Sequence, residues 1–232
     1  MIATYFQKLY ERSSFLNQEN ILRVASQFSG GRLLDVGCDN GKWTQQLGKV
    51  SKASELWGIE INSGPAEECR SKGIKVINQD LNNVWNVNES YFDIIHANQV
   101  IEHVPNVDFF LHETFKALKP GGTVIVSTEN GSSWHNIFAA IMGWQIFSLT
   151  NMSSLAVGVG NPLALNRGSG TPQSGWTHKT IFNYLGLIEF FKIHGFVSIT
   201  IQGAGYHPLP AVCGRWDVRH AHFITLAATK PL

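Results

Sequence analysis

The segment that most constrains the fold is Leu33–Thr44, which reads LLDVGCDNGKWT. A short apolar run carries Asp35 near its end, the chain breaks at Gly37 and again at Gly41, and the sequence then turns helical. This order predicts a buried strand, a tight turn and the start of a helix. Small residues at such a turn let a ligand approach the backbone, and the first turn of a helix presents N–H groups without helical partners. The simpler interpretation is a glycine-containing turn with no ligand, so the following segments must decide between the two.

Two further predicted strands end in side chains suited to a nucleoside. The first, Leu56–Asn62, places Glu60 near its carboxyl end, where a carboxylate can accept hydrogen bonds from both hydroxyls of a ribose. Taken alone, Glu60 could equally be a solvated charge at the end of a strand. The second, Lys75–Asn78, runs into Asp80 and Leu81, a polar side chain followed by an apolar one. That pair suits the amine and the ring face of an adenine.

The alternation of strands and helices continues through two more predicted strands. Phe92–Ala97 is followed by the sequence NQVIEHVP. Thr123–Thr128 follows a predicted turn at Lys119–Gly122. Strands that alternate with helices form a parallel sheet with right-handed crossovers, so residues 31–130 are predicted to be an α/β core.

These motifs, taken in order from Leu33 to Asn130, resemble those of the class I S-adenosylmethionine-dependent methyltransferases. The resemblance is closest to the small-molecule branch that includes ubiquinone-pathway and glycan-cluster enzymes. It implies an α/β fold, with a Rossmann-like, seven-stranded, mostly parallel sheet, helices on both faces and an antiparallel edge hairpin. It also implies a methyltransferase that uses S-adenosyl-L-methionine as cofactor. The positions that match the cofactor-binding residues of that family are Asp35, Gly37, Asp39, Gly41, Glu60, Asp80, Leu81 and Asn98.

The first loop departs from the family pattern at one position. Three glycines are usual there, and Asp39 replaces the middle one. Aspartate tolerates the left-handed backbone better than most residues, so the turn can survive. Its carboxylate would face the methionine part of the cofactor, where it could attract the amine or repel the carboxylate. A dehydrogenase fits worse, because a G-x-G-x-x-G count from Gly37 requires glycines at Asp39 and Lys42.

Length and composition agree with one catalytic domain. The 232 residues can bury one substantial core, so we expect 1–232 to be a single methyltransferase domain. A net charge of +1 and a charged fraction of 15% argue against nucleic acid as a partner. The three cysteines are odd in number and far apart, which predicts a reduced protein of the cytoplasm. The longest mainly apolar stretch, Ile137–Leu149, is too short to span a bilayer.

We expect four segments within that domain. They are an N-terminal helical lid (1–30), the cofactor-binding core (31–130), an acceptor-side region (131–220) and the last strand (221–232). In the acceptor-side region, apolar spacing predicts helices over Trp134–Leu149 and His178–His194, separated by the polar loop Thr150–Gly175. Two closing strands, Phe196–Gln202 and His222–Thr229, are predicted to pair antiparallel at a sheet edge.

The chemistry of methyl transfer directs attention to the histidines. A sulfonium methyl is already activated, so the enzyme must align donor and acceptor and exclude water. A hydroxyl acceptor also needs a base, and histidine is the usual choice near neutral pH. His103 is the preferred catalytic residue, because it lies just beyond the fourth predicted strand, where the active site of the resembled family opens. His135, His178 and His207 are the other candidates, and a purely structural His103 is the alternative.

A metal-dependent variant of the family can be tested on the same segment. Some ubiquinone-pathway and small-RNA methyltransferases carry Glu-x-x-Glu-His there and bind a divalent metal. This chain reads QVIEH over Gln99–His103, so the first carboxylate is an amide. Hard cations prefer charged oxygen ligands, and we therefore assign no metal ligands.

Two functions of different classes remain open. The first is methyl transfer by in-line displacement to a small-molecule or sugar acceptor, at oxygen. The second is a catalytically inactive S-adenosylmethionine-binding module that acts as a partner or scaffold subunit, and Asp39 is its main support.

The acceptor depends on the variable region 131–220. Its aromatic residues could form an apolar lining or stack on a sugar, and they are Trp134, Phe138, Trp144 and Trp176. We expect the apolar helix of this region to be mainly core, with a homodimer face or a peripheral membrane contact as alternatives.

Overall fold

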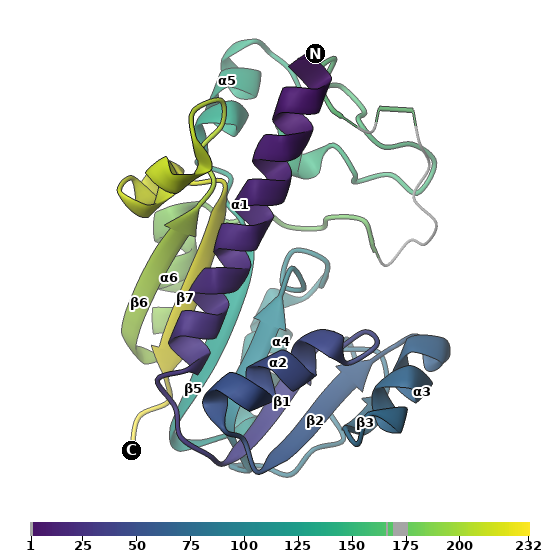
Figure 1. Cartoon of the computed structure of the whole chain (residues 1–232), viewed down its shortest axis with the longest axis vertical. Coiled ribbons are helices and arrows are strands. Elements are labelled where there is room, and N and C mark those ends of the chain that lie inside the picture. The colour runs from purple at the N-terminus through teal and green to yellow at the C-terminus, as the bar shows by residue number, and fades with distance from the viewer. Residues whose placement is uncertain (1, 166, 169–175) are drawn as a thin grey trace. The chain divides into compact units, whose positions relative to one another are not determined.

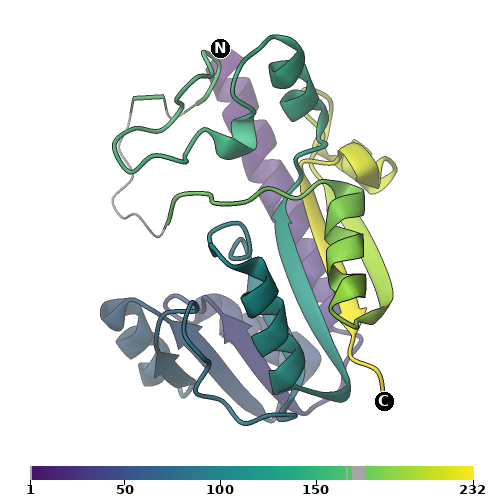
Figure 2. The same ribbon diagram turned by 180° about the vertical axis from the view of Figure 1, so that it is seen from behind.

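Figure 1 and Figure 2 show the computed structural model of the chain, which describes residues 2–165, 167–168 and 176–232. The first half contains α1 (Ile2–Ala25), β1 (Arg32–Val36), α2 (Lys42–Ser51), β2 (Glu55–Glu60), α3 (Ser63–Ser71), β3 (Lys75–Asn78), β4 (Phe92–Asn98) and α4 (Val107–Ala117). It is followed by β5 (Leu118–Glu129), α5 (Trp134–Ile141), η1 (Phe147–Leu149), α6 (Tyr184–Ile193), β6 (Val197–Ala204), η3 (Ala211–Arg215), η4 (Val218–His220) and β7 (Phe223–Thr229).

The strands of the described residues form a seven-stranded sheet in the order β3-β2-β1-β4-β5-β7-β6. The pairs β1–β2, β1–β4, β2–β3 and β4–β5 are parallel. β7 runs antiparallel to β5, because backbone hydrogen bonds join Gly122 to Lys230 and Asn130 to His222. The predicted fold class, a mostly parallel sheet with an antiparallel edge pair, is confirmed. In sheets of this type, ligands bind at the carboxyl ends of the strands where the strand order reverses, here between β1 and β4.

The contacts divide the chain into two compact units. Unit 1 comprises Met1–Asn20, Thr128–Leu187 and Ile201–Thr225, and unit 2 comprises Ile21–Ser127, Ile188–Thr200 and Leu226–Leu232. Each unit is described by itself below. The expectation of a single domain with four segments stays a prediction.

The core of unit 2 surrounds its central strands. Leu33 of β1, Ile94 of β4 and Ile125 of β5 are buried together with Leu47 of α2 and Ile21 of α1. Helices α2 and α3 lie on one face of strands β1 to β4, and α4 lies on the other (Figures 1 and 2). Strands covered on both faces read as continuous apolar runs, which is why these strands could be found in the sequence.

Unit 1 has its own apolar cluster. Leu9 and Leu16 from α1 are buried against Phe223 of β7, Ala204 of β6 and Ala211 of η3. Burial of a large apolar side chain contributes about 1.5–3 kcal/mol, so this cluster fixes the first turns of α1 within the unit. The N-terminal segment is helical, as expected, whereas its role as a lid stays a prediction.

The turn between β1 and α2 depends on three left-handed residues. Gly37 has φ 74°, Asp39 φ 45° and Gly41 φ 78°. A Cβ on Gly37 would lie 2.8 Å from Cγ2 of Val100, so this position requires glycine for space as well as for conformation. Asp39 adopts the left-handed backbone that the sequence analysis considered tolerable for aspartate.

The apolar helix predicted over Trp134–Leu149 is wrong in its extent. Helix α5 ends at Ile141, where Gly143 (φ 70°) turns the chain, and only a 3-10 turn, η1, follows. The expectation that this helix is mainly core is also wrong. Its buried residues are Asn136 and Ala139, whereas Ile141 is 77% exposed. A dimer face and a membrane contact stay predictions.

Two other predicted elements also differ. The helix predicted over His178–His194 begins only at Tyr184, because the backbone before it forms a bridge in which Phe182 pairs with Asn130. The predicted turn Lys119–Gly122 is counted within β5, since its glycines form strand-like hydrogen bonds with Lys230. Both errors concern backbone pairing with residues far away in the sequence.

We predict that Gly41→Ala destabilises the protein. A Cβ at Gly41 would lie 2.7 Å from both Sγ of Cys69 and Cδ1 of Ile74, and the backbone there is left-handed. The expected loss exceeds about 1 kcal/mol of unfolding free energy in urea titrations. Gly73→Ala, at φ 81° with no neighbour within 4 Å, measures the cost of the left-handed backbone without a steric clash. Gly64→Ala, in α3 with open space, involves neither a clash nor a left-handed backbone. Equal stability of the Gly41 and Gly64 variants would contradict the prediction.

Candidate functional site

The candidate cofactor site begins with a carboxylate in unit 2. Asp35 of β1 is 2% exposed, and both of its oxygens are engaged. Oγ1 of Thr44 donates to Oδ2 at 2.6 Å, and Nδ1 of His96 lies 2.7 Å from Oδ1. Because an ionised carboxylate only accepts, His96 donates through Nδ1. Asp35 therefore connects β1 to α2 and to β4, and its direct contact with a cofactor stays a prediction.

His96 is a buried residue that the sequence analysis did not single out. Its Nε2 lies 3.4 Å from Nε1 of Trp43, which can only donate a hydrogen bond. The imidazole thus donates to Asp35 and accepts from Trp43. The only available signal was a histidine between Ile95 and Ala97 in an otherwise apolar strand. Buried polar groups need partners, and that rule could have identified it.

Glu60 lies at the carboxyl end of β2, as predicted, and is 8% exposed. Its Oε2 accepts a hydrogen bond from the backbone N–H of Asp39 at 3.1 Å. Its Oε1 accepts from the backbone N–H of Asn62 at 2.8 Å and from the Asn62 amide at 2.9 Å. A carboxylate offers about four acceptor positions, so Oε2 retains one for a ligand hydroxyl. Glu60 also ties the turn after β1 to the end of β2.

The other predicted cofactor residues follow β3 and β4. Oδ1 of Asp80 accepts hydrogen bonds from the backbone N–H of Asn82 at 2.9 Å and from its amide at 2.7 Å. Leu81 and Asn98 are half-buried, and Asn98 is the last residue of β4. The carboxyl ends of parallel strands meet at one edge of a sheet, which brings these positions to the edge that carries Glu60. Their roles toward a cofactor stay predictions.

His103 lies in the turn after β4. Its backbone N–H donates to the carbonyl of Val100 at 2.9 Å, and its side chain is half-buried. Gln99 has a left-handed φ of 55°, which changes the direction of the chain after β4. Its backbone N–H donates a hydrogen bond to the carbonyl of Ser127 at 2.8 Å. The adjacent Glu102 is fully buried. The catalytic role of His103 stays a prediction.

Two cysteines pack beneath the cofactor turn. The Sγ atoms of Cys38 and Cys69 lie 3.6 Å apart, and both are free thiols, as is Cys213. Burial is the main cause that raises the pKa of Cys38 and of Cys69. These groups therefore stay protonated and act as small apolar side chains beside Ile74.

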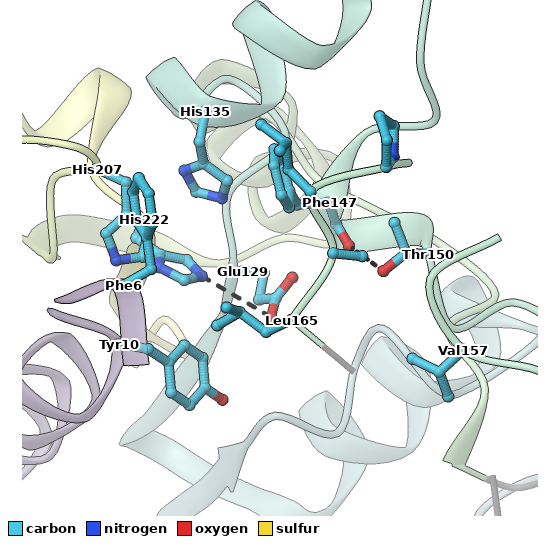
Figure 3. Close-up of a pocket in the computed structure, with 13 residues that line it drawn as sticks. Phe6, Tyr10, Glu129, His135, Phe147, Thr150, Val157, Leu165, His207 and His222 are labelled. Atoms are coloured by element: carbon cyan, nitrogen blue, oxygen red, sulfur yellow. Dashed lines mark hydrogen bonds and ion pairs between the residues drawn. The ribbon is translucent and has the colours of Figure 1, made fainter. Parts of the chain in front are cut away.

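Unit 1 contains a cavity of about 670 Å³, shown in Figure 3. Part of its wall is aromatic, from Phe6 and Tyr10 of α1 and Phe147 of η1. The polar part combines residues from distant positions in the sequence, which are Glu129, His135, His207 and His222. His135 and His207 were among the candidate bases, whereas Glu129 and His222 were missed. Glu129 ends β5, so its place at a strand's carboxyl end was the signal that could have found it.

The polar side chains of the cavity perturb one another. Nε2 of His222 lies 3.9 Å from Oε1 of Glu129, as the dashed line in Figure 3 marks. Burial alone would raise the pKa of Glu129, but the imidazoles of His222 and His178 and the hydroxyl of Ser148 lower it to about 2. Burial lowers the pKa of His207 to about 3 and that of His135 well below its usual value. At neutral pH the Glu129 carboxylate is therefore ionised, and the imidazoles of His135 and His207 are neutral.

The aromatic residues predicted to line an acceptor site do not line the unit 1 cavity. Trp134 is 42% exposed, stacks on the ring of His220 at 4.4 Å and donates from Nε1 to the hydroxyl of Tyr206 at 2.6 Å. Phe138 and Trp176 are 47% and 60% exposed. That these aromatic residues line an acceptor site stays a prediction. The loop Thr150–Gly175 lies partly outside the described residues.

Comparison with known proteins adds three findings. A methyltransferase domain family matches residues 9–192 of this chain. The mitochondrial ubiquinone biosynthesis O-methyltransferase of Rattus norvegicus is 27% identical over 142 residues, which cover 56% of this chain and 41% of that protein. A SAM-dependent methyltransferase structure from Thermotoga maritima superposes with a TM-score of 0.57 at 18% identity, covering 97% of this chain and 96% of that one.

A third relative has a cofactor named with it. Phosphoethanolamine N-methyltransferase 2 of Haemonchus contortus, in complex with S-adenosyl-L-methionine, superposes with a TM-score of 0.58 at 14% identity. The match covers 88% of this chain and 50% of that one. At such identity, the structural likenesses speak for the fold alone. The chain spans less than half the length of the rat protein, so that enzyme's substrate is not transferred to it here.

A doubly wound sheet with a glycine turn after β1 and an acidic residue at the end of β2 is typical of nucleoside-binding α/β proteins. With the family match over most of its length, the chain belongs to the methyltransferase domain family, as a class I S-adenosylmethionine-dependent methyltransferase domain. The predicted family and cofactor are thereby confirmed. No helix in the described part of the chain is both long and apolar enough to cross a membrane.

We predict that His96→Leu destabilises unit 2. It leaves the Asp35 carboxylate buried without one of its two partners, which costs about 3–5 kcal/mol of unfolding free energy. Calorimetry and urea titration measure the loss. His112→Leu, at an exposed position of α4, is the matched control. In a double-mutant cycle with Asp35→Leu, strictly additive losses would show that the pair does not interact.

Proposed function

We propose that the chain transfers the methyl group of S-adenosyl-L-methionine to an oxygen of a small-molecule or sugar acceptor. The observation that carries this proposal is the left-handed turn after β1, held by Glu60 at the end of β2, in a chain of the methyltransferase domain family. The choice of oxygen is supported by the relative from rat, whose name states O-methyl transfer in ubiquinone biosynthesis.

The proposed role of the turn is to hold the adenosyl and methionine parts. Glu60 would accept from the ribose through Oε2, with Asp80 and Leu81 toward the adenine and Asn98 nearby. The left-handed turn at Gly37, Asp39 and Gly41 would let the backbone approach the methionine part closely. Helix α2 begins at Lys42, so its first N–H groups point toward the same turn.

The proposed chemical step is an in-line displacement. The acceptor oxygen attacks the methyl carbon, the bond between that carbon and sulfur breaks, and its electron pair returns to sulfur, leaving S-adenosylhomocysteine. The acceptor's hydroxyl proton passes to a base, for which we propose His103. Its position just after β4 is the support for this role, since the turn there lies at the carboxyl edge of the sheet. Alignment and exclusion of water supply the remaining rate enhancement.

The alternative function is a cofactor-binding module without catalysis. Asp39 supports it, because a carboxylate in the turn could repel the carboxylate of the methionine part. Its backbone N–H, however, is held by Glu60 in the conformation that a glycine would adopt. Turnover of S-adenosylmethionine in a mixture of phenols and hydroxylated sugars separates the two functions, because a binding module alone would show none.

We predict that Glu60→Ala weakens S-adenosylmethionine binding by about 1.5–3 kcal/mol, the range for a hydrogen bond to a charged group. Isothermal titration calorimetry measures the change. Glu67→Ala removes an exposed carboxylate of α3 and should leave affinity unchanged. Because Glu60 also holds the turn, Glu60→Gln provides a variant of the same shape. Unchanged affinity in both Glu60 variants would refute the ribose assignment.

We predict that His103→Ala lowers kcat about 10²–10⁴-fold while the affinity for S-adenosylmethionine holds, because a general base acts on turnover. The acceptor for the assay is one found by the screen above. His112→Ala is the control for a histidine change on the nearby α4. A variant that keeps more than about half the activity at neutral pH would show that His103 is structural.

A further inference from the structure

Three histidines of unit 1 converge on one point in the cavity wall. His135 comes from α5, His207 follows β6, and His222 precedes β7 (Figure 3). Their ring centroids lie 5.0 Å (His135–His207), 4.6 Å (His135–His222) and 4.5 Å (His207–His222) apart. One ring nitrogen of each lies within 4.8 Å of one ring nitrogen of each of the others. The proposed methyl transfer uses none of these side chains.

Each imidazole has one nitrogen oriented by the protein and one that is not. Nε2 of His135 lies 3.5 Å from Oγ of Ser133, and Nε2 of His222 faces Glu129. His207 forms a hydrogen bond with the backbone of Leu9. The remaining nitrogens are Nδ1 of His135, Nε2 of His207 and Nδ1 of His222. All are shielded from solvent and have no hydrogen-bond partner among the described residues.

Three buried nitrogens without hydrogen-bond partners lower the stability of the folded protein unless a ligand binds them. A shielded polar atom without a partner costs about 1–3 kcal/mol, and here three lie in one cluster. Contacts between the three rings do not explain why one nitrogen of each ring has no hydrogen-bond partner among the described residues. Histidines that bind a metal characteristically donate their other ring N–H to a carboxylate, a backbone carbonyl or water. His207 shows the backbone form of that arrangement, and the Glu129 carboxylate lies 3.9 Å from Nε2 of His222.

We propose that His135, His207 and His222 bind a divalent transition-metal ion, with Glu129 as the hydrogen-bonding partner of His222. Imidazole is a ligand for Zn²⁺ and the neighbouring transition metals, whereas Mg²⁺ and Ca²⁺ prefer oxygen. Three protein ligands leave a fourth position for water or for an oxygen of a bound molecule, as in catalytic zinc sites. The three histidines line the same cavity as Tyr10 and Phe147, so such a molecule would occupy that cavity. The inference is independent of the proposed methyl transfer.

The site must close slightly around the ion. Zn–N bonds of about 2.0–2.1 Å in a tetrahedron place the nitrogens about 3.3 Å from one another. One ring nitrogen of each histidine now lies within 4.8 Å of one from each of the others, so the three rings must move closer together. Oε1 of Glu129 lies 3.9 Å from Nε2 of His222 and must move closer to accept its hydrogen bond.

The test uses the untagged full chain, because a polyhistidine tag would itself bind metal. The protein is stripped with a chelator and titrated with Zn²⁺ against a chromophoric competitor, and with Co²⁺ for its visible absorption bands. We expect one ion per chain and a tetrahedral Co²⁺ spectrum. His135→Ala, His207→Ala and His222→Ala should each weaken affinity more than about 100-fold, and Glu129→Gln about 10–100-fold, as for an outer partner.

Two controls keep the result specific. His112→Ala removes an exposed histidine of α4, and His220→Ala removes the histidine that stacks on Trp134 in the same unit. Both should bind Zn²⁺ as the unchanged protein does. Absence of binding by the unchanged chain, or binding kept within twofold by all three cluster variants, would overturn the proposal.

A measurement on the unchanged protein covers the case in which a cluster variant does not fold. X-ray absorption of the zinc-loaded chain should show imidazole scattering from three ligands at about 2.0–2.1 Å. Coordination by sulfur, or by oxygen alone, would overturn the assignment. Zn²⁺ should also raise the Tm of the unchanged protein, since a ligand that binds the folded state stabilises it. A Tm that does not respond to saturating Zn²⁺ would contradict it.

Discussion

The carboxylate of Asp35 joins three elements of unit 2 through two short hydrogen bonds. Thr44 brings the start of α2 to it, and His96 brings β4, with Trp43 on the far side of the imidazole. A buried carboxylate is tolerated only when its oxygens accept hydrogen bonds. The positions of β1, α2 and β4 relative to one another are therefore fixed together by Asp35. The turn after β1 begins two residues later, at Gly37, so the two hydrogen bonds of Asp35 also fix its position.

Glu60 performs a comparable role at the next strand. It receives the N–H of Asp39 on one oxygen and Asn62 on the other, and it thereby fixes the turn that β1 begins. The substitution of the family's middle glycine is thus accommodated locally, because Asp39 takes up a left-handed conformation with its N–H satisfied. Glu60 therefore has a structural role besides its proposed role in binding the ribose. A variant at Glu60 must be measured for stability as well as for cofactor affinity.

The polar wall of the unit 1 cavity has a different origin. Glu129, His135, His207 and His222 come from four separate stretches of chain, and no spacing in the sequence relates them. Glu129 and His222 meet because β7 returns antiparallel beside β5, where Asn130 pairs with His222. A metal-binding motif confined to one helix or loop would have been visible as a spacing in the sequence. This cluster forms only when β7 lies beside β5.

The sequence by itself determined the strands of the core, the turn after β1, the acidic end of β2 and the family. These features depend on local periodicity and on residues within one strand–turn–helix unit, so the pattern Leu33–Thr44 and the apolar strands were enough. Only the tertiary structure decided the length of α5, the late start of α6 and the partners of His96. It also decided the meeting of three histidines with Glu129. Helix α5 ends at a local turn at Gly143 inside an apolar stretch, whereas the others depend on hydrogen bonds and packing between residues far apart in the chain, which leave no periodic trace in the sequence.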